Sequence, residues 1–187
     1  MDLREISRRA ALISAALALV CSSGCSRGPN ELAAPLAMQV SSSGITAGVL
    51  GNAYTCAGSG ISPELLWSAP PARTRTLALV VTDLDSLFGY RFVHWVAYDI
   101  PASQRELPAG FAAQHAPAGG IERGSNDDGH DGYVPPCPPG GRTHHYQFVI
   151  YALDTVVNAP GLTKAALFAA IRGHVLAKGE LIGLGSH

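Results

Sequence analysis

The continuous apolar run at residues 77–81 constrains the fold of this chain more than any other feature. Its five residues, LALVV, match a strand that is buried on both faces. Runs rich in aromatic and β-branched residues at 91–101 and 146–153 also predict strands. Gly and Pro, 21 and 13 of the 187 residues, separate these runs. The sequence therefore predicts a mainly β domain of many short strands rather than a helical bundle.

Two segments before the apolar run are expected to supply short strands and core contacts. Residues 38–49 have the pattern of two short strands around a Ser-Ser-Ser-Gly turn. In the otherwise irregular segment 52–71, the predicted core residues are Leu65, Leu66 and Trp67.

The second half of the chain predicts one long loop and one helix. Residues 106–141 are rich in Gly, Pro, Asn and Asp, and a loop of this length inside a compact domain is usually functional. Residues 163–178 repeat apolar side chains at helical spacing, with Thr163 as the expected N-cap and Gly179 as the expected stop. On this helix we expect His174 to be a packing residue.

The N-terminus has the pattern of an export signal. Arg4, Arg8 and Arg9 precede an apolar run at 10–20, and small residues follow it. The run is shorter than the ~20 residues that a spanning helix needs. An N-terminal membrane anchor is the alternative interpretation. The Arg pair is also similar to a weak twin-arginine signal.

The residues SSGC, which end at Cys25, resemble a bacterial lipobox, in which the cysteine is acylated, for example with palmitate. Ser22 stands where such motifs usually have leucine, so plain secretion is the alternative. We expect residues 1–24 to be an export signal, 25–36 a tether, and 37–187 one domain. Acylated Cys25 would hold this domain at the extracytoplasmic or periplasmic face of a bacterial membrane.

The charge of the remaining chain excludes one class of partner. Cleavage before Cys25 removes three of 13 basic and two of 14 acidic residues, which leaves ten and twelve and a formal net charge of −2. No basic field exists to hold nucleic acid or an anionic membrane by charge alone. About 160 residues suit one domain with a core of its own.

Two cysteines remain in the predicted domain, Cys56 and Cys137. Outside the cytoplasm two such cysteines commonly form one disulfide. Two separate buried thiols are the alternative.

Polar side chains occur on three predicted strands where the pattern calls for apolar ones. Residues two apart in a strand share a face, so His144 and Tyr146 point one way and His145 points the other. Asp83 and Asp85 likewise share a face as they leave the apolar run. His94 lies in mid-strand, where its ring nitrogens need partners. Such violations of a core pattern are typical of a site.

Several motifs occur in a fixed order over residues 37–184. They include TDLDS, FVHWVAYDIP, GYVPPCPPGG and THHYQFVIYALD, with YTCAGSGISPELLWSAPP upstream and AIRGHVLAKGELIG downstream. Together they resemble the phosphatidylethanolamine-binding protein family, most closely its bacterial Raf-kinase-inhibitor-like branch. The resemblance implies an antiparallel β-sandwich with a C-terminal helix and a small anion-binding pocket at one end.

The resemblance also assigns site residues. The family's Asp-Pro-Asp motif falls on residues 83–85, its strand histidine on His94, and its Gly-x-His-Arg-Tyr motif on 142–146. The anion-binding residues it implies are Asp83, Asp85, His94, His144 and Tyr146.

The chain departs from the family pattern at three places. Leu84 replaces the motif's proline, and Ser86-Leu87 replaces the Ala-Pro that commonly follows, and the loss of two prolines would loosen the pocket wall. His145 replaces arginine and gives up its permanent charge and bidentate reach. An imidazole or a tyrosine hydroxyl can still donate hydrogen bonds to phosphate oxygens, and Asp83 would orient an imidazole and favour its charged form.

The leading interpretation is a non-enzymatic, exported and lipid-anchored protein that binds a phosphate-bearing or other small anionic head group. It needs no cofactor and no metal. One alternative is an interaction module whose pocket rim and long loop grip a kinase or protease. Another is a hydrolase in which His94 or His144, oriented by Asp83, activates water.

Other patterns are weaker. The histidines lack zinc-ligand spacing. The segment NDDGHDG at 126–132 has oxygen ligands suited to calcium but lacks the EF-hand spacing, and a solvated turn is the preferred interpretation. No Gly-x-Ser-x-Gly elbow or Gly-rich phosphate loop occurs.

Overall fold

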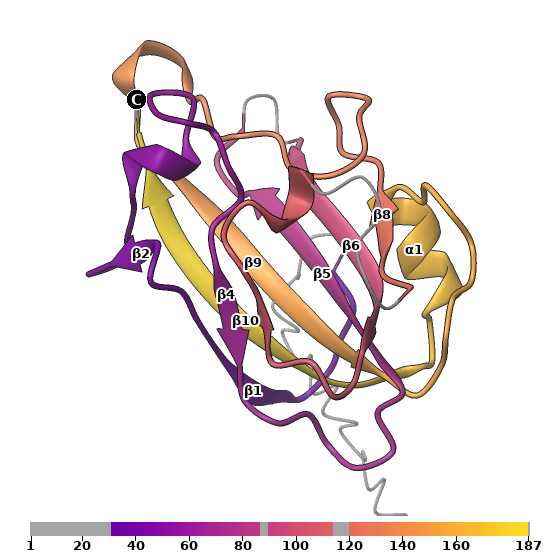
Figure 1. Ribbon diagram of the computed structural model, residues 1–187. Coiled ribbons are helices and arrows are strands. Elements are labelled where there is room, and N and C mark those ends of the chain that lie inside the picture. Colours follow the sequence, from indigo (N-terminus) through magenta and orange to yellow (C-terminus); the bar gives the residue numbers. More distant parts are fainter. Residues whose placement is uncertain (1–30, 87–89, 114–119, 187) are drawn as a thin grey trace, which may run out of the picture.

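The computed structural model describes residues 31–86, 90–113 and 120–186. This part of the chain forms a mainly β fold with one α-helix (Figure 1). Its strands are β1 (Leu36–Ser41), β2 (Ile45–Thr46), β3 (Val49–Leu50), β4 (Leu65–Trp67), β5 (Thr76–Asp83), β6 (Val93–Pro101), β7 (Glu106–Leu107), β8 (Glu122–Gly124), β9 (His144–Leu153) and β10 (Val175–Gly185). The helix is α1 (Lys164–Ala170), and the 3-10 turns are η1 (Asn52–Tyr54), η3 (Phe111–Ala113) and η4 (Pro139–Gly141).

The three long strands predicted from apolar runs are confirmed as β5, β6 and β9. Every residue of β5 is buried, as expected for a continuous apolar run. Strand β5 pairs antiparallel with β9 on one side and with β6 on the other, so it lies at the centre of the sheet. The central position explains why neither face of this strand carries exposed side chains.

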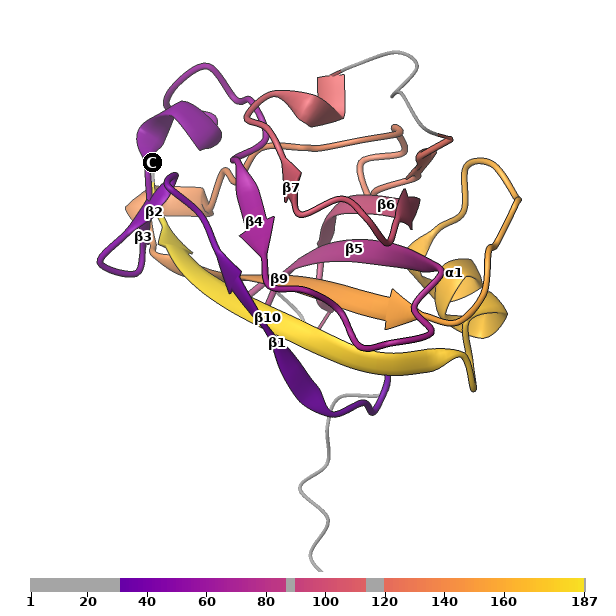
Figure 2. The ribbon, with the colours of Figure 1, turned by 60° about the horizontal axis from the view of Figure 1, so that its bottom comes forward.

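The strands lie in the order β7-β4-β1-β10-β9-β5-β6-β8. The sheet curls so that β4 and β7 face the layer of β5, β6, β9 and β10, as Figure 2 shows. Strand β1 joins the two layers, because it pairs with β10 in one and with β4 in the other. Most pairings are antiparallel, as the family resemblance implied, but β1 with β10 and β3 with β10 are parallel.

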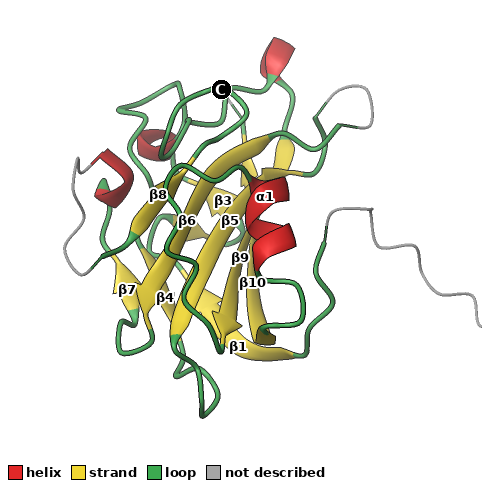
Figure 3. Cartoon of the chain, turned by 90° about the vertical axis from the view of Figure 1, so that its right-hand side faces the viewer, coloured by secondary structure: helices red, strands yellow, loops and turns green. Residues whose placement is uncertain are grey.

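Two apolar clusters cover the two faces of the main layer. One lies between the layers and contains Trp67 from β4, Trp95 from β6 and Phe148 from β9. The other packs β6 and β9 side chains, including Tyr151, against Phe168 of α1. Figure 3 shows α1 lying against this side of the sheet. Burial of apolar surface on both faces stabilises the central strands at roughly 25 cal/mol per Å² removed from water.

The predicted helix is much shorter than expected. Thr163 is the N-cap, and its side chain accepts a hydrogen bond from the N–H of Ala166 as the sequence indicated. The helix ends at Ala170, soon followed by Gly173 at φ 84°, a left-handed conformation that favours glycine. The expected extension to residue 178 is wrong, because the chain from Val175 onward is strand β10.

Gly179 has a different role from the helix stop that the sequence predicted. It lies inside β10, and a Cβ atom there would be 2.7 Å from the carbonyl oxygen of Met38 in β1. The absence of a side chain therefore lets β1 approach β10 closely. His174 is exposed rather than packed in a core, and its Nδ1 lies 2.9 Å from Oδ1 of Asp154.

The remaining expectations are partly met. Leu65 and Trp67 are core residues, but Leu66 is exposed because side chains alternate across β4. Strands β1 and β2 flank the serine-rich turn. The predicted long loop contains the short elements β7, η3, β8 and η4. The predicted export signal and Cys25 lie outside the described residues.

Candidate functional site

The ends of three neighbouring strands bring polar side chains together. In the antiparallel ladder of β5 and β9, Asp83 at the end of β5 is opposite Tyr146 near the start of β9. His94, at the start of β6, follows on the other side of β5. His144 is two residues before Tyr146 and therefore on the same face of β9. All four side chains are buried.

Asp83 and His144 form a buried pair. The Nδ1 atom of His144 lies 2.7 Å from Oδ2 of Asp83, and each side chain is less than a tenth exposed. The other carboxylate oxygen of Asp83 accepts a hydrogen bond of 2.8 Å from the N–H of Asp85. The N–H of Asp85 holds the Asp83 carboxylate in place, and the carboxylate in turn fixes the His144 ring through Nδ1. The Nε2 atom of His144 is left for a ligand.

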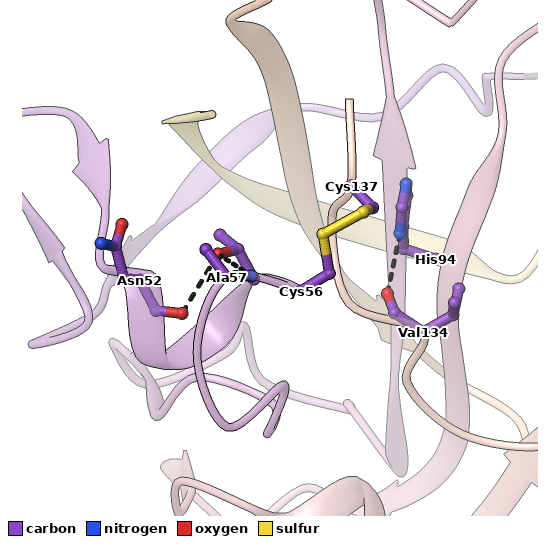
Figure 4. Close-up of a disulfide and its surroundings, with 7 residues drawn as sticks. Asn52, Cys56, Ala57, His94, Val134 and Cys137 are labelled. Atoms are coloured by element: carbon purple, nitrogen blue, oxygen red, sulfur yellow. Dashed lines mark hydrogen bonds between the residues drawn. A yellow bond between two sulfur atoms is a disulfide. The ribbon is translucent and has the colours of Figure 1, made fainter. Parts of the chain in front are cut away.

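His94 is held by the long loop. Its Nδ1 donates to the carbonyl oxygen of Val134 at 2.8 Å, as Figure 4 shows. Burial lowers the pKa of His94 from its ordinary value, against smaller opposing effects of the Val134 carbonyl, Asp83 and Asp127. A neutral His94 with its proton on Nδ1 presents Nε2 as an acceptor, whereas a protonated ring presents it as a donor.

Tyr146 lies between the two imidazoles. Its ring meets His94 edge-on with centroids 5.2 Å apart and stacks on His144 at 6.4 Å. Burial, helped by the charges of Asp83 and Asp85, raises the pKa of its hydroxyl, which therefore stays protonated at neutral pH. The hydroxyl makes no hydrogen bond with the part of the chain that the structure describes, so it can donate to a ligand.

These four residues line one cavity of about 290 Å³. Its other walls are Ser86 and Phe92, from the segment between β5 and β6, and Val134, Pro135, Cys137, Pro138 and Pro139 from the long loop. Neither Lys nor Arg occurs among the residues that line it. The polar groups are thus two imidazoles, the Tyr146 hydroxyl, the Ser86 hydroxyl, which is bonded to the backbone of Tyr90 and Phe92, and one carboxylate that is already paired.

A disulfide fixes the loop wall of this cavity. Cys56 and Cys137 are bonded, with Cα atoms 5.4 Å apart, and the N–H of Cys56 donates to the carbonyl of Pro136 (Figure 4). The predicted pairing is therefore present, and the alternative of two separate thiols is wrong. The bond ties Cys137, a cavity residue, to the segment after η1, and it restrains the prolines that follow.

Asp85 lies outside the cavity. Its carboxylate accepts hydrogen bonds of 2.6 Å from both the backbone N–H and the Nδ1 of exposed His145. The backbone bond is the main cause of its lowered pKa. The structure thus separates Asp85 from the other four predicted ligand-binding residues. Its role is to fasten the end of β5 to the start of β9.

The departure at Leu84 has a structural consequence that differs from the expected loosening. The N–H of Leu84 donates to the carbonyl oxygen of His145 at 2.9 Å. A proline has no N–H and could not make this bond. Leu84 therefore adds a hydrogen bond between the two segments that carry Asp83 and His144.

Gly185 is a site residue that sequence reasoning missed. It pairs with His144 across β9 and β10, and a Cβ atom there would lie 2.8 Å from Cε2 of Tyr146. Real Cβ atoms do not approach this closely, so any side chain would displace the tyrosine ring. No sequence pattern marks this glycine, because its contact arises from strand packing.

The segment at 126–132 is a turn held by its own asparagine. Oδ1 of Asn126, whose side chain is buried, accepts from the N–H groups of Asp128 and His130. Among the described residues, no group of three or more His, Cys, Asp or Glu side chains could hold a metal ion. In the same part of the chain, no helix has the length and hydropathy that crossing a bilayer requires.

Two solved structures share this fold. A phosphatidylethanolamine-binding protein homologue from Chlamydia trachomatis is 35% identical with a TM-score of 0.73, and the match covers 81% of this chain and 99% of that one. YbcL from E. coli, described as a new member of the mammalian PEBP family, is 30% identical with a TM-score of 0.71 and coverage of 79% and 96%.

Sequence relatives agree with the fold. A UPF0098 protein of Methanothermobacter thermautotrophicus is 42% identical over 133 residues, which are 70% of this chain and 86% of the relative. A UPF0098 protein of Chlamydia muridarum is 40% identical over 138 residues, 70% of this chain and 85% of the relative.

Fold and relatives together define a binding protein of a known type. The family model "Phosphatidylethanolamine-binding protein" matches residues 40–186, which is most of the chain. The chain belongs to the phosphatidylethanolamine-binding protein family.

Proposed function

We propose that this protein binds a small phosphate-bearing anion in the cavity formed by Asp83, His94, His144 and Tyr146. The observation that carries the proposal is Nε2 of His144, which lines the cavity and makes no hydrogen bond with the described residues, while Nδ1 is fixed by Asp83. The Tyr146 hydroxyl and the His94 ring supply two further polar groups on the same walls. Three groups from neighbouring strands suit the tetrahedral oxygens of a phosphate.

The chemistry of these groups sets the conditions for binding. A charge-assisted hydrogen bond contributes about 1.5–3 kcal/mol, so two or three of them give useful affinity without Lys or Arg. Nδ1 of His144 faces the Asp83 carboxylate and Nδ1 of His94 faces the Val134 carbonyl, so each Nδ1 is a donor, and Nε2 can then donate to an anion only when both ring nitrogens carry protons. Binding of an anion therefore takes up protons, and affinity should increase as the pH falls.

The cavity also suits a small organic substituent on the phosphate. Phe92 and the prolines at 135, 138 and 139 form its apolar walls, and its volume of about 290 Å³ suits a head group rather than a whole lipid. The phosphate of a head group such as phosphoethanolamine would then lie at the imidazoles, with its organic part against the prolines.

Calorimetric titration of the purified protein with phosphoethanolamine, inorganic phosphate and ethanolamine tests the proposal. We expect both phosphate compounds to bind and ethanolamine, which lacks the anion, not to bind. Binding of ethanolamine alone, or of none of the three at any pH between mildly acidic and neutral, would contradict it.

We further propose that the protein is exported and held at the extracytoplasmic membrane face by a lipid on Cys25. The support is the signal pattern in residues 1–24 and the SSGC sequence. Replacing Cys25 with Ser should move the protein from the membrane fraction to the soluble fraction of the exported material. An unchanged distribution would show that the cysteine carries no anchor.

A further inference from the structure

A second cavity lies on the other face of the main layer. Its volume is about 480 Å³, and it lies between α1, the start of β6 and the first described residues of the chain. Val93 and Phe168, which line it, belong to the apolar cluster beneath α1, whereas Tyr146 of the first site belongs to the cluster between the layers. The two cavities are therefore separate.

Three cations line this second cavity: Arg91, Lys164 and Arg172. Within the described residues, the guanidinium groups of both arginines make no hydrogen bond and no ion pair. Nζ of Lys164 lies 3.4 Å from the Thr82 hydroxyl and 5.6 Å from the centre of the Phe168 ring, so its contacts are uncharged. None of the three cations has a carboxylate within ion-pair distance in this part of the chain.

The two carboxylates at the cavity are already occupied. Glu31 is paired with Lys178, a buried side chain of β10. Oδ2 of Asp127 accepts a hydrogen bond of 2.7 Å from the N–H of Val93. Asp127 keeps its charge and offsets one of the three positive charges, whereas Glu31 is shared with Lys178, so an excess of positive charge remains at the cavity.

Arg91 and Arg172 are exposed, whereas Lys164 is partly buried, so the cost of this excess is greatest at Lys164. Burial is the main cause that lowers the pKa of Lys164, and the positive charge of Arg91 lowers it further. The charges of Asp127 and Glu31 act in the opposite direction. Like charges that share a partly buried site repel one another, and an anion bound among them removes that repulsion. Arginine and lysine are also the side chains best suited to phosphate oxygens.

We propose that this cavity is a second anion site, which binds a phosphate group between Arg91, Lys164 and Arg172. Leu32 and Phe168 supply an apolar side for the organic part of the ligand. The site differs from the first in its chemistry. Permanent cations bind the anion here at neutral pH, whereas the histidine site requires protonation.

Two sources could supply the phosphate: a lipid head group or a free phosphate compound. Glu31 and Leu32 line the cavity, and they follow Cys25 by only six and seven residues. Six extended residues span at most roughly 21 Å. If Cys25 carries a lipid, as proposed above, this cavity is held close to the membrane surface, where phosphate head groups are abundant.

Calorimetry near neutral pH with inorganic phosphate tests the site itself. The variant Arg91→Gln/Arg172→Gln should lose at least about tenfold in affinity. The matched control is Arg73→Gln/Arg75→Gln, which removes two exposed arginine charges that line neither cavity and should leave affinity unchanged. His144→Ala should retain this binding, so that failure of the histidine site and failure of the cationic site can be distinguished.

Sedimentation of the full chain with vesicles distinguishes the sources. The vesicles contain either phosphatidylcholine alone or phosphatidylcholine with phosphatidylglycerol. The apolar segment at 10–20 contributes equally to every variant. Loss of free phosphate binding in Arg91→Gln/Arg172→Gln supports the site with a soluble ligand. Loss of vesicle binding alone supports it with a lipid head group. If this variant behaves like the Arg73→Gln/Arg75→Gln control in both measurements, the proposal is wrong.

Discussion

The Nδ1 atom of His144 lies 2.7 Å from Oδ2 of Asp83, and both buried side chains line one cavity. The pair joins the end of β5 to the start of β9, 61 residues apart in the sequence. It fixes the ring so that Nε2, and not Nδ1, is the atom available to a ligand. The geometry accounts for two adjacent histidines with different roles, since His145 is exposed and pairs with Asp85 instead.

The first prediction concerns Asp83. Asp83→Asn keeps the size of the side chain and an acceptor oxygen, but it removes the negative charge that balances a protonated imidazole. We expect anion affinity to fall roughly tenfold at mildly acidic pH and less at neutral pH. Calorimetric titration with sulfate at both pH values measures this, because sulfate keeps its charge across the range. A larger loss at neutral pH would contradict the assigned role.

The second prediction concerns His94 and stability. Its pKa is lowered from 6.5 in the folded protein, so the unfolded chain takes up the proton first as the pH falls. Its contribution to stability is therefore complete above about pH 6.5 and is lost below it, by at most about 1.4 kcal/mol per pH unit.

Urea unfolding of the wild type and of His94→Gln, without added anion, isolates this contribution. Between about pH 7.5 and pH 5.5 the wild type should lose stability relative to the variant, which cannot titrate at this position. Added sulfate should reduce the loss, because an anion stabilises the protonated ring. A difference between the two proteins that stays constant with pH would contradict the prediction.

The third prediction concerns Gly185. Gly185→Ala would place a methyl group 2.8 Å from the Tyr146 ring, so the ring must move. Overpacking of this kind costs roughly 1–3 kcal/mol of stability, and the displaced hydroxyl should weaken anion binding severalfold. The control is Gly183→Ala, whose new Cβ would meet the flexible end of Ile45 instead. Equal effects of both variants on anion affinity would disprove a positioning role for Gly185.

The fourth prediction concerns the disulfide. The bond between Cys56 and Cys137 closes a loop of 81 residues, and in the chain-entropy model its loss costs roughly 4 kcal/mol. Replacing both cysteines with Ser should lower the urea midpoint. Because Cys137 lines the cavity, the variant should also bind the anion more weakly while it is still folded. Anion affinity that survives the replacement would separate the disulfide from the site.

Sequence patterns predicted the central strands well because burial on both faces leaves a clear apolar record. Strand alternation also placed His144 and Tyr146 on one face and His145 on the other. The structure agrees with this prediction, because His144 and Tyr146 are buried and His145 is exposed. The helix was overextended because residues 175–178 suit a helix or a strand equally well. Pairing of β10 with β9 and β1 decides between them, and local sequence does not contain that information.

Other site features depend on contacts between distant segments. The bond from His94 to the Val134 carbonyl and the approach of Gly185 to Tyr146 arise only when the strands and the loop are packed. The second cavity combines Glu31, Arg91 and Arg172, which lie far apart in the sequence and carry no common motif. Asp85 was grouped with the ligand-binding residues because it shares a motif with Asp83, whereas its side chain turns to His145.

The comparison of His144→Ala with His145→Ala in a phosphoethanolamine titration, both made in the Arg91→Gln/Arg172→Gln background so that the cationic cavity contributes little, tests the central claim most directly. Each variant removes one imidazole from adjacent positions of β9, one buried at the cavity and one exposed beside Asp85. We predict that His144→Ala weakens binding by about ten- to a hundredfold, since a donor to the anion is lost, and that His145→Ala leaves it nearly intact. A greater loss in His145→Ala than in His144→Ala would contradict the assignment of the site.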